Sequence, residues 1–201
     1  MKLFMPSRVI FEQASMEYPL GKEIYQFFKN KPVEIINTSA AYAARLIPGK
    51  TPAEIYANSK RTLLVTTNKN KKLDVCKPSA DYQFSLVSNC PGNCEYCYLQ
   101  TTQGAKPYIK VYVNLEDIFS IIKDYINQNK PKTTTFEAAS LGDPLAIEHI
   151  TGSLAKTIEF FAGQEYGKLR VVTKYNNVDS LLNLNHNQNT QFRISINSNY
   201  V

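Results

Sequence analysis

No stretch of this 201-residue sequence is apolar for long enough to cross a bilayer, and its first eleven residues contain Lys2 and Arg8 but no uninterrupted apolar segment. Internal repeats are absent, and the only biased tract is an Asn-rich turn at 183–189. The apolar fraction of 43% and charged fraction of 20% argue against disordered and fibrous classes. We therefore expect a globular, cytoplasmic protein that does not interact with membranes.

Positive charge is in modest excess and forms no concentrated basic stripe. The formal net charge of +6 favours a polyanionic partner, but a surplus of this size is common in proteins that never contact nucleic acid. Lys69, Lys71 and Lys72 lie in a polar stretch, where a solvated loop is a simpler interpretation than a phosphate contact. Charge alone identifies no partner.

Cysteine is scarce, and its distribution does not suit a disulfide framework. Three of the four cysteines, Cys90, Cys94 and Cys97, fall within eight residues, and the intervening residues 91–93 favour a loop. Such a group suits an inorganic ligand set in a reducing compartment. Three thiolates would leave one iron of a four-iron four-sulfur cluster open to an exogenous ligand, much as a catalytic metal keeps an open position. The spacing therefore predicts a reactive iron–sulfur site.

A closed zinc site is the alternative, with Cys76, His149 or His186 as the fourth ligand. Zinc sites usually combine two short ligand pairs, and this sequence has no second pair. His149 lies in a helical pattern and His186 in a polar turn, where an ordinary core or surface role is the simpler interpretation. A disulfide is disfavoured by the spacing and by a reducing compartment.

Hydrophobic periodicity predicts an α/β protein with a domain boundary after residue 76. In the first domain, residues 1–76, we expect strands at 8–11, 33–36 and 62–67, a helix at 21–29, and a second helix that Thr51 caps. In the second domain, residues 77–201, we expect strands at 82–87, 134–138, 169–173 and 191–196, alternating with helices at 115–128, 147–162 and 178–182. The sequence ends directly after the fourth of these strands, which predicts a truncated fold.

The cysteine motif, with Tyr96 just before its last cysteine, resembles the signature of radical S-adenosylmethionine enzymes. Further segments resemble the spore photoproduct lyase family: 17–22 (EYPLGK), 77–82 (KPSADY), 97–102 (CYLQTT), 106–109 (KPYI), 111–114 (VYVN) and 195–198 (SINS). The resemblance spans essentially the whole chain. It implies a small N-terminal α/β domain followed by the first part of a (β/α)6 radical S-adenosylmethionine barrel, without the last strands and the DNA-binding region.

The resemblance implies a carbon–carbon lyase that repairs DNA containing spore photoproduct, a methylene-bridged thymine dimer. An electron from a donor such as flavodoxin or ferredoxin would reach the cluster, and S-adenosylmethionine would then yield methionine and a 5'-deoxyadenosyl radical. That radical would remove hydrogen from C6 of the lesion, the bridge would fragment, and a thymine radical would recover a hydrogen atom.

The resemblance also assigns cofactor contacts. Tyr96 would lie against the adenine, Lys174 and Ser195 would hold the carboxylate and ribose side, and Asn197 is a further candidate. Lys174 follows an apolar strand, which would place it at the carboxyl end of a parallel strand, although an ordinary strand-end lysine is the plain alternative.

The strand at 134–138 leads into the expected contact with the methionyl amine. Its end at Ala138, together with Asp143, would lie near that amine. Leu141 and Gly142 stand where a more polar pair is expected.

Ser140 is the more consequential departure from the family, because characterised members often carry a cysteine there as the final hydrogen-atom donor. A serine cannot replace it, since its O–H bond is much stronger than a thiol S–H bond. Cys76 is the cysteine outside the cluster motif and the natural replacement, although a lone cysteine is more often a small buried hydrophobe. Tyr98 resembles the family tyrosine that relays hydrogen between donor and cofactor; packing in the core is its alternative role.

Two other functions remain open from the sequence. Ser140 is compatible with a radical S-adenosylmethionine enzyme that acts on another substrate, and the truncated pattern is compatible with a non-catalytic fragment that binds an iron–sulfur cluster or zinc.

Overall fold

The computed structural model describes residues 3–39, 45–95, 97, 102–138 and 141–196. Its strands form two five-stranded sheets, ordered β2-β1-β3-β7-β6 and β10-β9-β8-β5-β4. Neighbouring strands are parallel except for the short terminal pairs β6–β7 and β4–β5, which are antiparallel. The predicted α/β class is confirmed.

The strands of the first sheet are β1 (Arg8–Glu12), β2 (Glu34–Thr38), β3 (Thr62–Thr66), β6 (Val87–Ser88) and β7 (Ile109–Tyr112). Those of the second sheet are β4 (Asp74–Val75), β5 (Tyr82–Phe84), β8 (Thr134–Ala138), β9 (Gly167–Thr173) and β10 (Thr190–Ile194). The helices are η1 (Gln13–Glu17), α1 (Pro19–Phe28), α2 (Pro52–Lys60), α4 (Leu115–Asn129), η3 (Pro144–Ile147), α5 (Glu148–Thr151) and α6 (Ser153–Ala162).

Central strands form where the sequence carries short continuous apolar runs. All five residues of β3 are buried, and so are the last four of β1, as expected for parallel strands that are covered on both faces. One hydrophobic core extends from Val9 in β1 to Val171 in β9, so both sheets share it.

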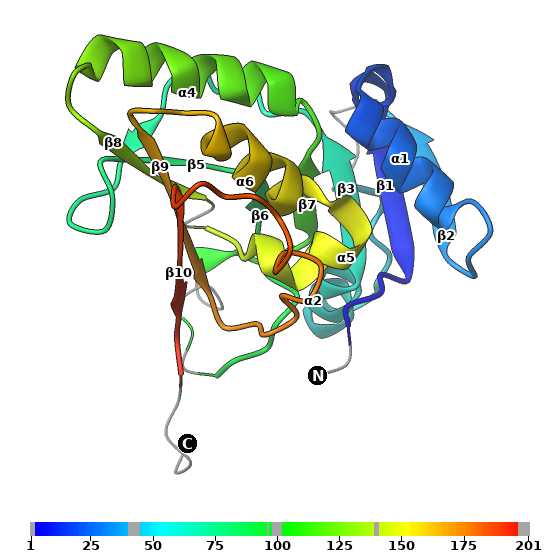
Figure 1. Cartoon of the computed structure of the whole chain (residues 1–201). Coiled ribbons are helices and arrows are strands. Elements are labelled where there is room, and N and C mark those ends of the chain that lie inside the picture. The colour runs from blue at the N-terminus through cyan, green and yellow to red at the C-terminus, as the bar shows by residue number, and fades with distance from the viewer. Residues whose placement is uncertain (1–2, 40–44, 96, 98–101, 139–140, 197–201) are drawn as a thin grey trace.

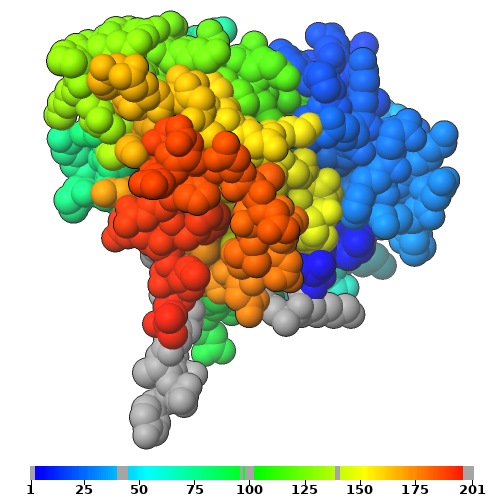
Figure 2. Space-filling view, in the orientation of Figure 1, coloured from blue at the N-terminus to red at the C-terminus, as the bar shows by residue number. Residues whose placement is uncertain are grey.

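The helices cover these sheets with amphipathic faces. In α1, Leu20, Ile24 and Phe28 recur every four residues and are buried. In α2, the Thr51 side chain accepts a hydrogen bond from the Glu54 amide at 3.2 Å, which confirms the predicted cap. Figure 1 shows α1, β1 and β2 on one side of the molecule and β10 along the opposite edge, with α6 between them. In the space-filling view the N-terminal and C-terminal segments likewise occupy opposite sides of this face (Figure 2).

The strand predicted at 82–87 is in fact two strands in different sheets. β5 pairs with β8, whereas β6 pairs with β7. The chain crosses from one sheet to the other at Ser85 and Leu86, and a segment whose residues all suit a strand gives no sign of such a crossing. The prediction was wrong here, and it also missed β7.

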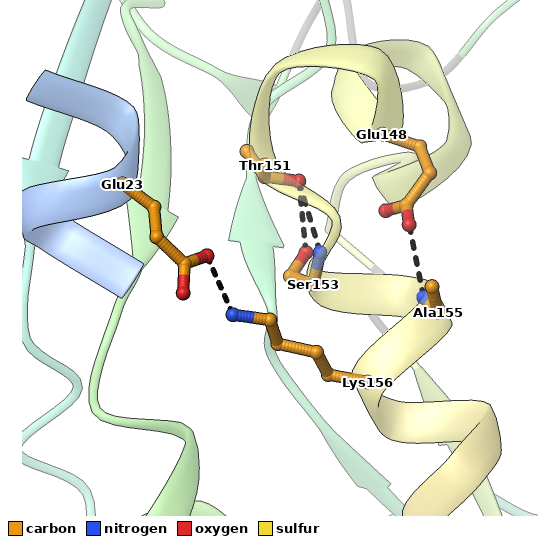
Figure 3. Close-up of polar contacts among 6 residues, drawn as sticks. All are labelled: Glu23, Glu148, Thr151, Ser153, Ala155 and Lys156. Carbon is orange, nitrogen blue, oxygen red and sulfur yellow. Dashed lines mark hydrogen bonds and ion pairs between the residues drawn. The ribbon is translucent and has the colours of Figure 1, made fainter. Parts of the chain in front are cut away.

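The helix predicted at 147–162 is interrupted at Gly152, which has a φ of +58°. This left-handed conformation ends α5, and α6 begins at the next residue. The N-cap position of α6 is thus Gly152, which has no side chain to accept a hydrogen bond from the first amides. The carboxylate of Glu148 takes the place of a cap, because it accepts hydrogen bonds from the amides of Leu154 and Ala155 at 2.8 and 2.9 Å. Figure 3 shows the bond from Ala155.

The helix predicted at 178–182 is a series of turns, with a hydrogen bond from the Leu181 amide to the Val178 carbonyl at 2.8 Å. So short a segment gains too few helical hydrogen bonds to offset the cost of nucleation. Leu181 is buried in the core, and Val178 packs against it.

The domain boundary after residue 76 stays a prediction. Strands on both sides of it share sheets, since β7 pairs with β3 and β4 pairs with β5.

Candidate functional site

The cysteine loop, residues 90–97, begins where the two sheets meet. Asn89 precedes it with a φ of +64°, and its amide donates to the Leu141 carbonyl at 2.8 Å. Its side-chain amide donates to the Tyr108 carbonyl at 2.6 Å. A Cβ on Gly142 would lie 2.9 Å from both the Asn89 carbonyl oxygen and Val87 Cγ2. Glycine at this departure from the family pattern therefore permits the close crossing of the two segments.

Two of the three cysteine sulfurs of this loop lie close to Gly92. A Cβ on this residue would lie 3.4 Å from Cys90 Sγ and 3.8 Å from Cys94 Sγ, so glycine leaves the space between the thiols open. The Gly92 amide donates to Cys90 Sγ at 3.4 Å, and the Cys97 amide donates to the Cys94 carbonyl at 3.0 Å. All three thiols are partly accessible. Soft thiolates on a tight loop, with a backbone amide directed at one sulfur, fit an iron–sulfur cluster.

Lys60, the last residue of α2 and two residues before β3 of the first sheet, contacts this loop. Its ammonium donates to the Cys90 carbonyl at 2.6 Å, the Gly92 carbonyl at 2.9 Å and Gln103 Oε1 at 3.4 Å. The residue is only 7% exposed. Burial lowers the pKa of this ammonium, and the three thiolates of the loop act in the opposite direction.

Tyr175 approaches the loop from the second sheet. Its hydroxyl lies 3.7 Å from Cys90 Sγ, and its amide donates to the Thr173 hydroxyl at 3.0 Å. Burial and the neighbouring Cys90 thiolate raise the pKa of Tyr175, which keeps its hydroxyl protonated. Burial also raises the pKa of Cys90, whereas the Gly92 amide and the Tyr175 hydroxyl lower it.

Asp143 joins the carboxyl ends of β8 and β9. Its carboxylate accepts hydrogen bonds from the Thr173 hydroxyl at 2.8 and 2.9 Å and from the amides of Leu145 and Lys174, both at 3.2 Å. Burial raises the pKa of Asp143, and these donors oppose the rise. The carboxylate thus fixes the loop after β8 against the end of β9.

Several predicted cofactor residues lie at the ends of three adjacent parallel strands. Ala138 ends β8, Lys174 directly follows β9, and the Ser195 amide donates to the Thr173 carbonyl at 2.8 Å just after β10. Parallel α/β folds bind ligands at this edge of the sheet. The structure therefore brings Ala138, Asp143, Lys174 and Ser195 to one edge, and Tyr175 links that edge to the cysteine loop.

Cys76 lies elsewhere on the second sheet, in the turn between β4 and β5. The Ala80 amide donates to its carbonyl at 3.0 Å, and its own amide donates to the Asp81 carbonyl at 3.2 Å. Burial and the nearby Glu137 carboxylate raise the pKa of the Cys76 thiol. Glu137 precedes Ala138 in β8, so this thiol is held near the same strand that leads to the cofactor edge.

A polar hollow of about 310 Å³ adjoins the turn after Cys76. It is lined by Pro78, Ser79, Arg170, Gln191 and Arg193. The Ser79 hydroxyl donates to the Glu137 carboxylate and accepts a hydrogen bond from Arg193 Nη1 at 2.6 Å.

The zinc alternative gains no support from the described part of the chain. His149 lies on α5, where its Nε2 is 2.7 Å from the Phe4 carbonyl oxygen, and His186 is exposed in a turn. Among the described residues, no three His, Cys, Asp or Glu side chains are grouped so that they could hold a metal ion. An iron–sulfur cluster distributes its ligands over several irons, so it does not require sulfurs that converge on one point.

A family model described as spore photoproduct lyase matches residues 4–201. This chain belongs to the spore photoproduct lyase family. Spore photoproduct lyase from Geobacillus sp. (strain Y412MC61) is 49% identical over 201 residues, which are 100% of this chain and 59% of the relative. Spore photoproduct lyase from Bacillus subtilis (strain 168) is 44% identical over 198 residues, which are 98% and 58% of the two chains. The chain thus spans less than two thirds of these family members.

Solved structures of spore photoproduct lyase share the fold described above. One has bound AdoMet and dinucleoside spore photoproduct, and it carries one cysteine-to-alanine and one serine-to-cysteine substitution. It matches with a TM-score of 0.93 at 50% identity, covering 99% of this chain and 58% of the other. A second structure, complexed with dinucleoside spore photoproduct, matches with the same values. The match supports a partial radical S-adenosylmethionine barrel, as the sequence predicts.

Some predicted residues cannot be placed relative to this site. Tyr96, Tyr98, Ser140 and Asn197 lie outside the described residues.

In the part of the chain that the structure describes, no helix has the length and apolar character needed to span a bilayer.

Sequence reasoning missed Lys60, Tyr175 and Glu137. Tyr175 directly follows Lys174, a predicted cofactor residue at a strand end, so its position in the sequence could have indicated that it lies near the site. Nothing near Lys60 in the sequence indicates that its ammonium contacts a loop 30 residues later.

Proposed function

We propose that this chain binds a four-iron four-sulfur cluster and S-adenosylmethionine and acts as a carbon–carbon lyase on spore photoproduct in DNA. The family supports this activity, and a relative has been solved with both AdoMet and dinucleoside spore photoproduct. One observation of this chain carries the proposal: the cysteine loop packs through Tyr175 against the strand ends that present Asp143 and Lys174.

Cys90, Cys94 and Cys97 would hold the cluster, with one iron left for the methionyl group of the cofactor. Together these two groups supply a 5'-deoxyadenosyl radical when an electron arrives, from a donor such as flavodoxin or ferredoxin. The Gly92 amide and the Tyr175 hydroxyl would stabilise negative charge on Cys90 Sγ.

The strand ends would orient the cofactor. Lys174 would pair with its carboxylate, and Ser195 would hydrogen-bond on the ribose side. Asp143 and the Ala138 backbone would face the methionyl amine; because Thr173 and two amides already donate to Asp143, its carboxylate is fixed before the cofactor binds. Tyr96 against the adenine and Asn197 as a further contact complete the proposed set.

Cys76 would return the hydrogen atom to the thymine radical. In this step the S–H bond breaks, a C–H bond forms on thymine, and a thiyl radical remains on Cys76. Tyr98 would then give its O–H hydrogen atom to the thiyl, restoring the thiol, and would recover a hydrogen atom from the 5'-deoxyadenosine that had taken one from the lesion. The donor must be a protonated thiol, and the raised pKa of Cys76 beside Glu137 meets that requirement.

The hollow next to this turn would receive the DNA. Arg170 and Arg193 line it, and arginine side chains are well suited to phosphate oxygens. A lesion bound there would lie near Cys76 along β8 and β10.

Anaerobic reconstitution tests the cluster. We expect iron and sulfide in near-equal amounts, with visible absorption, in the parent chain and loss of both in Cys94→Ala. Cys76→Ala is the matched control, because it also removes one thiol and should keep its cluster. A full cluster and S-adenosylmethionine cleavage in Cys94→Ala would refute the assignment.

A repair assay with dinucleoside spore photoproduct tests the reaction. Cys76→Ala should still cleave S-adenosylmethionine, while thymine formation falls and misquenched adducts accumulate; adding Ser140→Cys should restore repair. Clean repair by Cys76→Ala at the parental rate would exclude Cys76 as donor. Cofactor cleavage without any repair by the parent would favour another substrate, and the absence of both would favour a non-catalytic fragment.

A further inference from the structure

Lys60 is a buried cation whose donors converge on one loop. The ammonium has three N–H groups, and three acceptors lie within hydrogen-bond distance: the carbonyls of Cys90 and Gly92 and the side chain of Gln103. A buried lysine is costly unless its donors are satisfied, so these contacts hold both partners in place. The carbonyls belong to the start of the cysteine loop, whereas Gln103 follows it. The ammonium therefore connects the entry and the exit of the loop.

The position of Lys60 is fixed independently of the loop. It is the last residue of α2, and the next strand, β3, is buried at every position. In the described part of the loop, residues 90–95 and 97, the Cys97 amide donates to the Cys94 carbonyl at 3.0 Å, and Asn89 forms a bridge with Gly142 at the entry. The end of α2 thus gives the loop a further support from a regular element.

The charge of Lys60 also acts on the sulfur ligands. All three thiolates interact electrostatically with this ammonium. A positive charge at short range in a partly buried site stabilises the more negative of two redox states. For a cluster on these ligands, the more negative state is the reduced one.

We propose that Lys60 is a positioning residue for the cysteine loop, which it holds through the Cys90 and Gly92 carbonyls, and that its charge favours reduction of a cluster bound there. The second part rests on the proposed function, whereas the first concerns the protein without any cluster.

Lys60→Met and Lys60→Arg separate the two effects. Methionine keeps an apolar stem of similar length and removes the charge and its donors. Arginine keeps the charge, but its planar guanidinium cannot direct three donors at the same converging acceptors. Lys168→Met is the matched control, because Lys168 Nζ also donates to a backbone carbonyl, that of Gln188 at 3.1 Å. Lys168 lies near the start of β9, whereas the site residues Lys174 and Tyr175 follow the end of this strand.

Hydrogen exchange of cluster-free protein measures how the loop is held. We expect amides of peptides that cover residues 88–103 to exchange at least about tenfold faster in Lys60→Met, and also faster in Lys60→Arg. Peptides from β8 and β9 should exchange at the parental rate, as should the loop in Lys168→Met. Parental exchange of the loop in both Lys60 variants would overturn the positioning role.

A potentiometric titration of reconstituted protein, followed by visible absorption or electron paramagnetic resonance, measures the charge effect. We expect the ratio of reduced to oxidised cluster at a fixed potential to fall about tenfold in Lys60→Met, equivalent to about 59 mV for one electron. Lys60→Arg and Lys168→Met should stay near the parental potential. An unchanged potential in Lys60→Met would overturn the electrostatic role.

The two roles of Lys60 can still be tested if Lys60→Met does not fold or if the parent takes up no cluster. If Lys60→Met does not fold, as judged by far-UV circular dichroism, Lys60→Arg decides: fast loop exchange supports the positioning role and parental exchange overturns it. If the parent takes up no cluster, the proposed function and the electrostatic role both fail. The exchange experiment then still decides whether Lys60 holds the loop.

Discussion

Glu148 offers a test of the structure through the pH dependence of stability. It is 4% exposed, and its carboxylate accepts hydrogen bonds from the Leu154 and Ala155 amides at the start of α6. These bonds favour the ionised form, whereas burial favours the neutral form. Burial prevails and raises the pKa of Glu148 from 4.5 to about 7.

The sign of the effect follows from proton binding. Between the unfolded pKa of 4.5 and the folded pKa of about 7, the folded protein binds more protons at this site than the unfolded chain does. The free energy of unfolding therefore falls as pH rises through this window. The contribution of this one group is about 2–3 kcal/mol between about pH 5 and about pH 8.

Glu148→Gln removes the titration and keeps one oxygen acceptor for the helix amides. We expect the variant to be less stable than, or similar to, the parent at about pH 5. Its stability relative to the parent should rise by about 2–3 kcal/mol by about pH 8, because only the parent loses stability through ionisation of this group. Glu148→Ala should cost more at low pH, since two amides lose their acceptor at about 1–3 kcal/mol each.

Urea denaturation followed by far-UV circular dichroism provides the measurement, since the chain has no tryptophan. Glu159→Gln is the control, because Glu159 is exposed on α6, the helix whose first amides donate to Glu148, and its effect on stability should be small. Glu23→Gln, which breaks the exposed ion pair with Lys156, should cost no more than about 1 kcal/mol. The raised pKa of Glu148 would be refuted if the difference in unfolding free energy between Glu148→Gln and the parent stayed constant, or moved in the parent's favour, as pH rises. Either result would show that the hydrogen bonds from the amides affect the pKa of Glu148 at least as strongly as burial does.

Three further predictions concern the site. Glu137→Gln should shift the alkylation profile of Cys76 to lower pH, measured residue by residue by mass spectrometry, because the carboxylate raises the pKa of that thiol; an unchanged profile would contradict its role. Gly142→Ala should cost about 1–3 kcal/mol and reduce iron loading, since its Cβ would meet Asn89 O at 2.9 Å, and parental loading would argue against the tight crossing. DNA binding by this chain should be weak and salt-sensitive in a gel shift, because a net charge of +6 forms no concentrated stripe in the sequence; tight lesion-selective binding at moderate salt would contradict this.

Local sequence signals predicted the elements that depend on local physics. The strand expected at 134–138 coincides with β8 (Thr134–Ala138), and the cap at Thr51 starts α2 as expected. Each signal lies within a few residues of the structure it specifies. The cysteine spacing is also a local signal, because three thiols within eight residues indicate a compact inorganic site, and that site stays a prediction.

The failures have a different physical origin. The run at 82–87 is uniformly compatible with a strand, but its two halves are taken up by different sheets through pairings with residues more than 20 positions away. Gly152 lies within an apolar pattern of helical period, and that period does not show that the glycine takes a left-handed conformation and divides the helix. Hydrophobic periodicity thus locates apolar segments but not the breaks within them.

The position of the cysteine loop follows from the crossing between the two sheets. The chain leaves β5 in one sheet, enters β6 in the other, and reaches Cys90 two residues later. Lys60 at the end of α2, two residues before β3 of the first sheet, donates to carbonyls of the loop, and Tyr175, two residues after β9 of the second sheet, contacts Cys90 across 85 residues of sequence. A change in how the two sheets pack together would therefore displace the thiols relative to the strand ends that carry Lys174 and Ser195. Residues 1–76 thus help to position the proposed cysteine ligands, although every residue proposed to bind the cluster or the cofactor lies beyond them.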